Sequence, residues 1–433
     1  MDSASHALSR SRLDRLKLER LRALLSAILP GNTLYAAKFA GRDLAIESFA
    51  DLVHWPFTLK EDLVAGAAAS GRPANLTYAT ENYVRCHQTS GTRGRPLPVF
   101  DTAADWVWWM DCWREILGRA AVGPGDRVLV ASSFGPFLGF WSGFEGVLAR
   151  GAMAIPTGGM STLARLEMAR SLSATVLLAT PSYALHLAEV ATENGIHLPS
   201  LPIRQVIVAG EPGGSIPSVR ARIAAAWGAD VLDHAGASEV GPWGVGDRQG
   251  RGVEVLEPWF HPEFIAIDTG RPAAPGEVSE LVLTTLGRCG APVIRYRTGD
   301  LVRPAWPTSD EIAAGESPWV RLEGGILGRA DDMLVVRGVN IFPAAIDGII
   351  RGFPEVAEYR LTVFSRESLD ELALEIEDQR DDPARVAREL AVRLGLRVGV
   401  TAVSAGSLPR FEGKGRRIVD RRSDRGEHPR THA

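Results

Sequence analysis

Three short apolar segments decide the fold class: TVLLAT (175–180), QVIVAG (205–210) and ADVLDHAG (229–236). Each has the length of a β-strand and ends in a small residue, and the stretches between them, 183–194 and 218–227, are expected to be helical. Strands that alternate with helices of this length are typical of a mostly parallel sheet covered by helices. Functional loops are therefore expected at the carboxyl ends of these strands.

The regions before this stretch extend the same pattern. Residues 128–131 and 153–156 predict further strands, and residues 13–29 predict an amphipathic helix near the N-terminus. The segment FTLKEDL (57–63) predicts a short helix, in which Thr58 followed by Glu61 would form a capping box.

The C-terminal third changes in character. After residue 251 the short segments favour β-structure without helices, and Gly324, Gly325 and Gly328 indicate a hinge before a mixed region. The predicted fold class is α/β. It comprises a large N-terminal domain (1–328) of mostly parallel, helix-covered sheets plus a β subdomain. A small mobile α+β lid domain (329–421) follows, and the polar residues 422–433 are expected to be a disordered tail.

Composition excludes several classes of protein. The 433 residues are 45% hydrophobic and 23% charged with a net charge of −4, so there is no basic belt for nucleic acid. No apolar run is long enough to cross a membrane. The three cysteines are too widely spaced for a zinc ribbon or a disulfide scaffold, which favours a cytoplasmic protein. Only four of the 48 basic residues are lysine.

Two motifs could contact phosphates, and the second of them follows a predicted strand. TSGTRGRP (89–96) combines hydroxyl residues and glycines, which suits a phosphate-binding loop, although a plain surface turn is the alternative. DHAGASE (233–239) lies at a strand end, where Glu239 could hold Mg²⁺ on a nucleotide phosphate or simply cap a helix or pair with an arginine.

Three further motifs lie downstream. In YRTGD (296–300), Asp300 could bind ribose hydroxyls or be an ordinary turn residue. GRADD (328–332) indicates a polar joint between domains or a solvated linker. In GKG (413–415), Lys414 is a compact charge on a mobile loop or part of a basic tail.

Together and in this order, the motifs resemble those of the adenylate-forming superfamily of acyl-CoA ligases, most closely its phenylacetate-CoA ligase branch. The likeness runs along nearly the whole chain and includes PFTLKEDL, AGEP, EPWFHPE, ELVLTTL, PVIRYRTGDL and GRADDMLVVRGVNIFP. This resemblance implies an enzyme that uses ATP, Mg²⁺ and CoA to convert a carboxylic acid into an acyl-CoA thioester, AMP and pyrophosphate. No structural zinc is predicted, because Cys289, His234 and His261 form no ligand spacing.

The resemblance also implies roles for individual residues. Glu239 would hold Mg²⁺, Lys414 would bridge the carboxylate and the α-phosphate, and Asp331 would be the hinge of the lid. The remaining ATP- or AMP-binding residues would be Thr89, Ser90, Gly91, Thr92, Arg95, Gly210, Glu211, Pro212, Asp233, His234, Ala235, Gly236, Ser238, Asp300 and Arg329. The phosphate loop departs from the family pattern at Arg93 and Arg95, where that pattern has a threonine or serine and a lysine.

An acid pocket is expected beside the nucleotide site. Its candidate lining residues are Phe134, Phe137, Phe140, Gly236 and Ala237. Aromatic walls suit an aryl or arylacetic acid, and the region offers no Asp or Lys for a charged amino-acid substrate. Trp106, Trp109 and Trp113 share one face of a predicted helix and could contribute, although such a stripe is more often core.

Three hypotheses for function remain open. The leading one is transfer of the activated acid to CoA; the alternatives are transfer to a carrier-protein thiol or an amine, and a non-catalytic nucleotide-binding regulator. The expected partners are the acid, ATP and CoA, and neither nucleic acid nor membrane. A carrier protein and a homodimer are left open.

Overall fold

The computed structural model describes most of the chain. The described residues are 9–29, 31–89, 96–136, 138–267, 269–330, 334–336, 339–341, 343–366, 369–409 and 417–422. Close contacts divide the chain into two compact units between Ile326 and Leu327. No helix in the described ranges combines the length and the apolar character needed to cross a bilayer.

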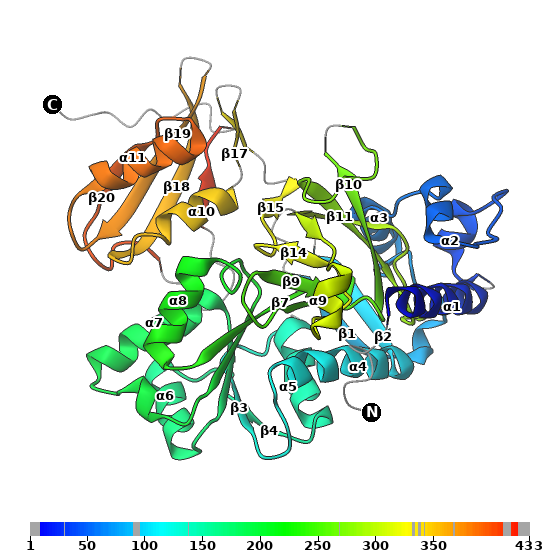
Figure 1. Ribbon diagram of the computed structural model, residues 1–433, viewed down its shortest axis with the longest axis horizontal. Coiled ribbons are helices and arrows are strands. Elements are labelled where there is room, and N and C mark those ends of the chain that lie inside the picture. Colours follow the sequence, from blue (N-terminus) through cyan, green and yellow to red (C-terminus); the bar gives the residue numbers. More distant parts are fainter. Residues whose placement is uncertain are drawn as a thin grey trace. The chain divides into compact units, whose positions relative to one another are not determined.

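A nine-stranded mixed sheet forms the centre of the N-terminal unit (Figure 1). Its strand order is β13-β14-β9-β8-β7-β6-β5-β3-β4. The parallel strands are β3 (Arg127–Val130), β4 (Met153–Pro156), β5 (Val176–Ala179), β6 (Gln205–Ala209) and β7 (Asp230–Ala237). The antiparallel part comprises β8 (Gly241–Gly246), β9 (Gly252–Val255), β13 (Pro304–Ala305) and β14 (Arg321–Glu323).

Helices cover both faces of this sheet because successive strand residues point to opposite sides. Leu129, Leu177 and Val206 pack into the core with α6 (Thr162–Ser171), α7 (Pro181–Glu193) and α8 (Pro217–Trp227). Val128, Leu178 and Ile207 pack into a second core with α4 (Ala103–Arg119) and α5 (Leu138–Ala149). The predicted α/β fold class is confirmed by this arrangement.

The β subdomain is an antiparallel sheet in which β11 (Ser279–Thr285) lies between β10 (Phe260–Ala266) and β12 (Tyr296–Val302). The expectation that helices are absent after residue 251 is wrong in one place, since α9 (Ser309–Ala313) is a short helix with a Thr308–Glu311 capping box. A local capping pattern is enough to nucleate one turn inside a β region.

Smaller elements complete the N-terminal unit. They are α1 (Arg10–Ile28), α2 (Thr33–Lys38), η1 (Phe49–His54), α3 (Lys60–Ser70), η2 (Thr80–Asn82), η3 (Leu198–Ser200) and the antiparallel pair β1 (Tyr83–Gln88) and β2 (Pro98–Thr102).

The predicted capping box at Thr58 is wrong. Helix α3 begins at Lys60, and the Thr58 hydroxyl instead donates to the carbonyl of Ile294 (2.7 Å). The acidic cap comes from Asp62, whose carboxylate accepts a hydrogen bond from the Leu59 N–H (2.8 Å).

The C-terminal unit has its own core of mainly aliphatic side chains. Its four-stranded sheet has the order β20-β19-β18-β21, with α10 (Pro343–Ile350) and α11 (Pro383–Leu394). The strands of this unit are β15 (Gly328–Arg329), β16 (Leu334–Val336), β17 (Val339–Ile341), β18 (Val356–Arg366), β19 (Leu369–Asp378), β20 (Gly399–Ala402) and β21 (Ile418–Asp420).

Candidate active site

Two of the predicted nucleotide motifs lie at the carboxyl ends of neighbouring parallel strands. Ala209 of β6 is in register with His234 of β7, so the segments that follow lie at the same sheet edge. The first segment contains Gly210, Glu211 and Pro212, and the second contains Ala235, Gly236, Ala237, Ser238 and Glu239. Gly210 has φ +94°, a conformation that favours glycine, and this lets the chain turn sharply out of β6.

Asp233, a residue of β7, stabilises this edge of the sheet through hydrogen bonds. Its buried carboxylate accepts hydrogen bonds from the Ser215 hydroxyl (2.5 Å) and from the N–H of His234 (3.0 Å). Burial raises the pKa of Asp233 to about 6, and the hydrogen bond from Ser215 only partly offsets that rise. A Cβ at Gly214 would lie 2.6 Å from the Asp233 carboxyl carbon, so the loop after β6 can pack here only as glycine.

His234 points to the opposite face of β7. Its Nδ1 lies 2.7 Å from the carbonyl oxygen of Gly244, and its ring packs against Trp113 with 4.7 Å between centroids. Burial lowers the pKa of His234 to about 4, so the imidazole is neutral at physiological pH. Nδ1 then donates to the carbonyl, which fixes the ring as part of the α4 side of the sheet.

Glu211 caps the start of the neighbouring helix, α7. One of its carboxylate oxygens accepts a hydrogen bond from the N–H of Ser182 (2.7 Å), which satisfies a donor in the first turn of α7. This contact holds the loop after β6 against the start of α7, which follows β5.

Glu239 lies where three elements meet. Its Oε1 accepts a hydrogen bond from the hydroxyl of Tyr296 in β12 (3.0 Å) and lies 3.5 Å from Nζ of Lys60 in α3. Its backbone carbonyl accepts from Arg288 (2.9 Å). A carboxylate has about four lone-pair positions, so these contacts leave acceptor capacity for another ligand.

Two further predicted nucleotide-binding residues, Asp300 and Arg329, lie in β12 and β15. Asp300 is buried in the strand that also carries Tyr296, and its N–H donates to the Thr298 hydroxyl (3.0 Å). Arg329 belongs to the C-terminal unit.

Aromatic side chains from the loop after β3 and from α5 form a cluster. Phe134 packs edge-on against Trp141 and Phe144, with centroid distances of 4.9 and 5.5 Å. Phe134 and Phe140 are half-buried and pack against the core that contains α4. Trp106, Trp109 and Trp113 are buried in that core.

Several predicted residues lie outside the described part of the chain. They are Ser90, Gly91, Thr92, Arg95, Phe137, Asp331, Lys414 and the tail residues 423–433. Thr89 is described: its N–H donates to the Leu97 carbonyl and its hydroxyl accepts from the Leu97 N–H, both at 2.9 Å.

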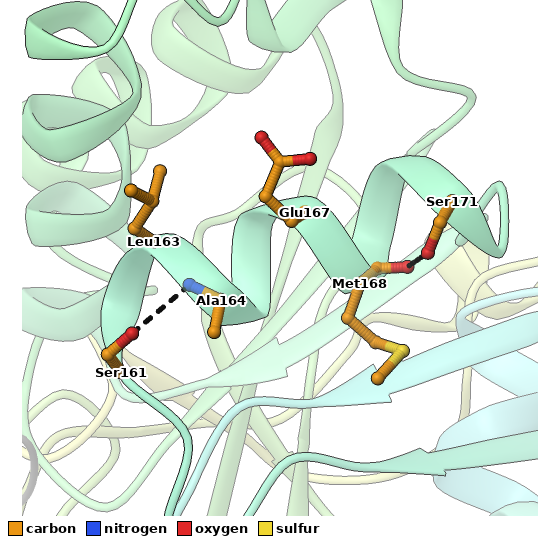
Figure 2. A pocket seen from close by; sticks show the side chains of 6 residues that line it. All are labelled: Ser161, Leu163, Ala164, Glu167, Met168 and Ser171. Carbon is orange, nitrogen blue, oxygen red and sulfur yellow. Dashed lines mark hydrogen bonds between the residues drawn. The ribbon is translucent and has the colours of Figure 1, made fainter.

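A surface pocket lies elsewhere in the N-terminal unit (Figure 2). It is lined by Ser161, Leu163, Ala164, Glu167, Met168 and Ser171. All but Ser161 belong to α6, and none is a predicted site residue. Within the described ranges, His, Cys, Asp and Glu side chains do not gather in groups of three that could hold a metal ion.

Comparison with known proteins identifies the family. Residues 66–287 match the AMP-binding enzyme family, and residues 338–422 match the AMP-binding enzyme C-terminal domain. The chain belongs to the AMP-binding enzyme family. It is 32% identical to the phenylacetate-coenzyme A ligase of Escherichia coli (strain K12), with 95% of each chain covered. It is 30% identical to that of Pseudomonas putida, with 94% and 93% covered.

Solved structures agree with this assignment. A 2-hydroxyisobutyryl-CoA ligase in the postadenylation state, in complex with R3-HIB-AMP, superimposes with a TM-score of 0.89 at 27% identity, covering 97% of this chain and 92% of that one. The same ligase in complex with 2-HIB-AMP and CoA, in the thioesterification state, gives a TM-score of 0.72 at 27% identity with the same coverage. The predicted resemblance to the adenylate-forming superfamily and its phenylacetate-CoA ligase branch is confirmed.

Sequence reasoning missed Lys60 and Tyr296 as neighbours of Glu239. The one available signal was that Lys60 is among only four lysines in the chain, and that it lies within PFTLKEDL, a segment that resembles the family.

Proposed function

We propose that this chain is an AMP-forming acid–CoA ligase, which activates a carboxylic acid with ATP and transfers the acyl group to CoA. The observation that carries the proposal is the match to phenylacetate-CoA ligases over about the whole of both chains, with Glu239 at the strand edge where such a site is expected.

The first step joins two anions. A carboxylate oxygen of the acid attacks the α-phosphorus of ATP, and the bond to pyrophosphate breaks. Little acid–base chemistry is required, so the protein must position the reactants and neutralise their charge. In the second step the CoA sulfur attacks the acyl carbon, loses its proton, and releases AMP.

Each predicted residue has a proposed task in this scheme. Ser238 contacts the α-phosphate, Asp300 binds the ribose, and Lys414 bridges the reacting carboxylate and phosphate. Glu211, Pro212 and the strand end 233–236 border the adenine, while the loop from Thr89 to Arg95 binds the outer phosphates.

The donor set at Glu239 fits one magnesium ion. Mg²⁺ prefers one or two carboxylates together with substrate phosphates, and Glu239 supplies a single carboxylate with remaining acceptor capacity. When bound, the ion would offset the charge of the departing pyrophosphate.

The proposed acid is aryl or arylacetic. The support is the aromatic cluster of Phe134, Trp141 and Phe144 in the loop after β3 and in α5, with Phe140 close in sequence and small residues at Gly236 and Ala237. Flat aromatic substrates stack well against such rings.

An acid panel tests the proposal. Aryl, arylacetic and short aliphatic acids are incubated with ATP, Mg²⁺ and CoA, and both AMP and the thioester are quantified. We expect AMP release that requires both the acid and CoA, together with stoichiometric thioester from an aryl or arylacetic acid. AMP release that responds to an amine or a carrier-protein thiol but not to CoA would contradict the proposed acceptor.

The lid is tested separately. We propose that a rotation at Asp331 removes Lys414 after the first step and presents another face of the lid domain for CoA. Lys414→Ala should slow adenylate formation by roughly 10²–10³ yet largely spare thioester formation from supplied acyl-adenylate. Equal loss in both steps would contradict this rotation.

A further inference from the structure

The backbone before α3 is fixed against the β subdomain. The N–H of Thr58 donates to the carbonyl of Arg295 (2.9 Å), and the N–H of Arg297 donates to the carbonyl of Thr58 (3.0 Å). This single parallel bridge pairs Thr58 with Tyr296. Because Thr58 is also fully buried, Lys60 begins α3 at a defined position beside Tyr296.

Lys60 and Tyr296 converge on one oxygen. The Tyr296 hydroxyl donates to Oε1 of Glu239 at 3.0 Å, and the Lys60 ammonium lies 3.5 Å from the same atom. The Lys60 side chain is 44% exposed and that of Glu239 only 11% exposed. The ammonium is therefore on a solvent-accessible side chain, whereas the carboxylate that it contacts is largely enclosed.

Three other cations among the described residues of the N-terminal unit have carboxylate partners of their own. These pairs are Lys38 with Asp62 (2.8 Å), Arg295 with Glu263 (2.8 Å) and Arg288 with Asp101 (2.7 Å). Lys60 differs from them because its partner is the carboxylate that the proposed metal would occupy.

We propose that Lys60 is a nucleotide-positioning cation that holds Glu239 in the metal-free enzyme and binds the β- and γ-phosphates once magnesium takes the carboxylate. This inference rests on the proposed function. Mg²⁺ bonds its oxygen ligands at about 2.0–2.1 Å, so phosphates that share an ion with Glu239 come within a few ångströms of this carboxylate.

Electrostatics and the length of the lysine side chain explain how Lys60 would move from Glu239 to the phosphates. A bound dication repels the ammonium from Glu239, while the triphosphate attracts it. The flexible four-carbon stem of lysine lets the charge move without a change in the backbone, which the Thr58 bridge holds in place. The exposed side of Lys60 is the side from which a phosphate can approach.

Binding measurements on the full chain test this role without catalysis. We would titrate wild type and Lys60→Met with MgATP in the absence of acid, with magnesium pyrophosphate, and with AMP. Loss of a charge-assisted hydrogen bond predicts that the dissociation constants for MgATP and magnesium pyrophosphate rise roughly tenfold or more. AMP lacks the β- and γ-phosphates, so its affinity should not change.

Two variants serve as controls. Lys60→Arg keeps the charge and should recover most of the MgATP affinity. Arg170→Met removes a more exposed cation, which pairs with Glu167 on α6, and should bind all three ligands like the wild type.

The outcomes separate the explanations. Unchanged MgATP affinity in Lys60→Met overturns the proposal, and an equal loss of AMP affinity overturns it in favour of a structural role. If the wild type itself binds neither MgATP nor pyrophosphate, the proposed function fails, and the role of Lys60 fails with it.

Discussion

Two lysines of the N-terminal unit contact glutamates in opposite surroundings. Lys17 of α1 and its partner Glu257 are 1% and 0% exposed, and Glu257 also accepts hydrogen bonds from Arg10 and from the N–H of Val320 (2.8 Å). Lys60 and Glu239 form a looser pair that is open on the lysine side. The difference indicates that the first cluster stabilises the fold and the second is free to exchange partners.

Burial explains this difference. Burial alone would raise the pKa of Glu257, but the charges of Lys17 and Arg10 lower it overall. A buried carboxylate is therefore ionised only while its cations remain. An exposed pair loses little when it separates, because water solvates both ions.

The largest effect is expected from breaking the buried cluster. Lys17→Met should reduce the free energy of unfolding by about 3–5 kcal/mol, because it leaves a buried carboxylate short of one cation. Urea denaturation measures this change. The double variant Lys17→Met/Glu257→Leu should recover much of the loss, and a single-variant loss below about 1 kcal/mol would contradict the comparison.

Removing the charge of Glu239 should slow the reaction without changing the stability of the fold. Glu239→Gln keeps the hydrogen bond from Tyr296 possible but should slow acid-dependent ATP–pyrophosphate exchange by roughly 10²–10³. The urea midpoint should stay at the wild-type value. An unaltered exchange rate would remove Glu239 from the nucleotide site.

The buried imidazole of His234, in β7, predicts that the stability of the fold depends on pH. Its pKa is about 4 in the folded chain and about 6.5 when unfolded, so the unfolded state binds more protons in this interval. Wild type should therefore gain roughly 2–3 kcal/mol of stability relative to His234→Gln as the pH rises from about 4 to 6.5. Asp233, whose raised pKa gives the opposite slope, is common to both chains and cancels.

Denaturation curves collected across this pH range provide the measurement. A difference between the two chains that stays constant with pH would mean that His234 is not held neutral by burial.

The smallest effect is expected from Lys60. Lys60→Met should change the free energy of unfolding by only about 0–1 kcal/mol, since the pair is partly exposed. The same urea series measures this change. A loss as large as that of Lys17→Met would make Lys60 structural and remove the contrast on which its proposed role depends.

Local sequence patterns predicted the strands well where a short apolar segment is bounded by turn residues. The apolar segments at 175–180, 205–210 and 229–236 became β5, β6 and β7, because each is short and bounded by turn residues. The capping box at Thr58 failed because the same hydroxyl found a buried partner, the Ile294 carbonyl, more than two hundred residues away. Local hydrogen-bonding rules cannot anticipate such a competitor.

The amino-acid sequence by itself determined the fold class, the family and the position of Glu239 at the end of a strand, because these depend on periodicity and on contiguous motifs. Only the tertiary structure decided which groups surround that carboxylate. Lys60, Glu239 and Tyr296 meet because Thr58, just before α3, forms a bridge with β12. Such long-range convergence follows from packing that short stretches of sequence do not encode.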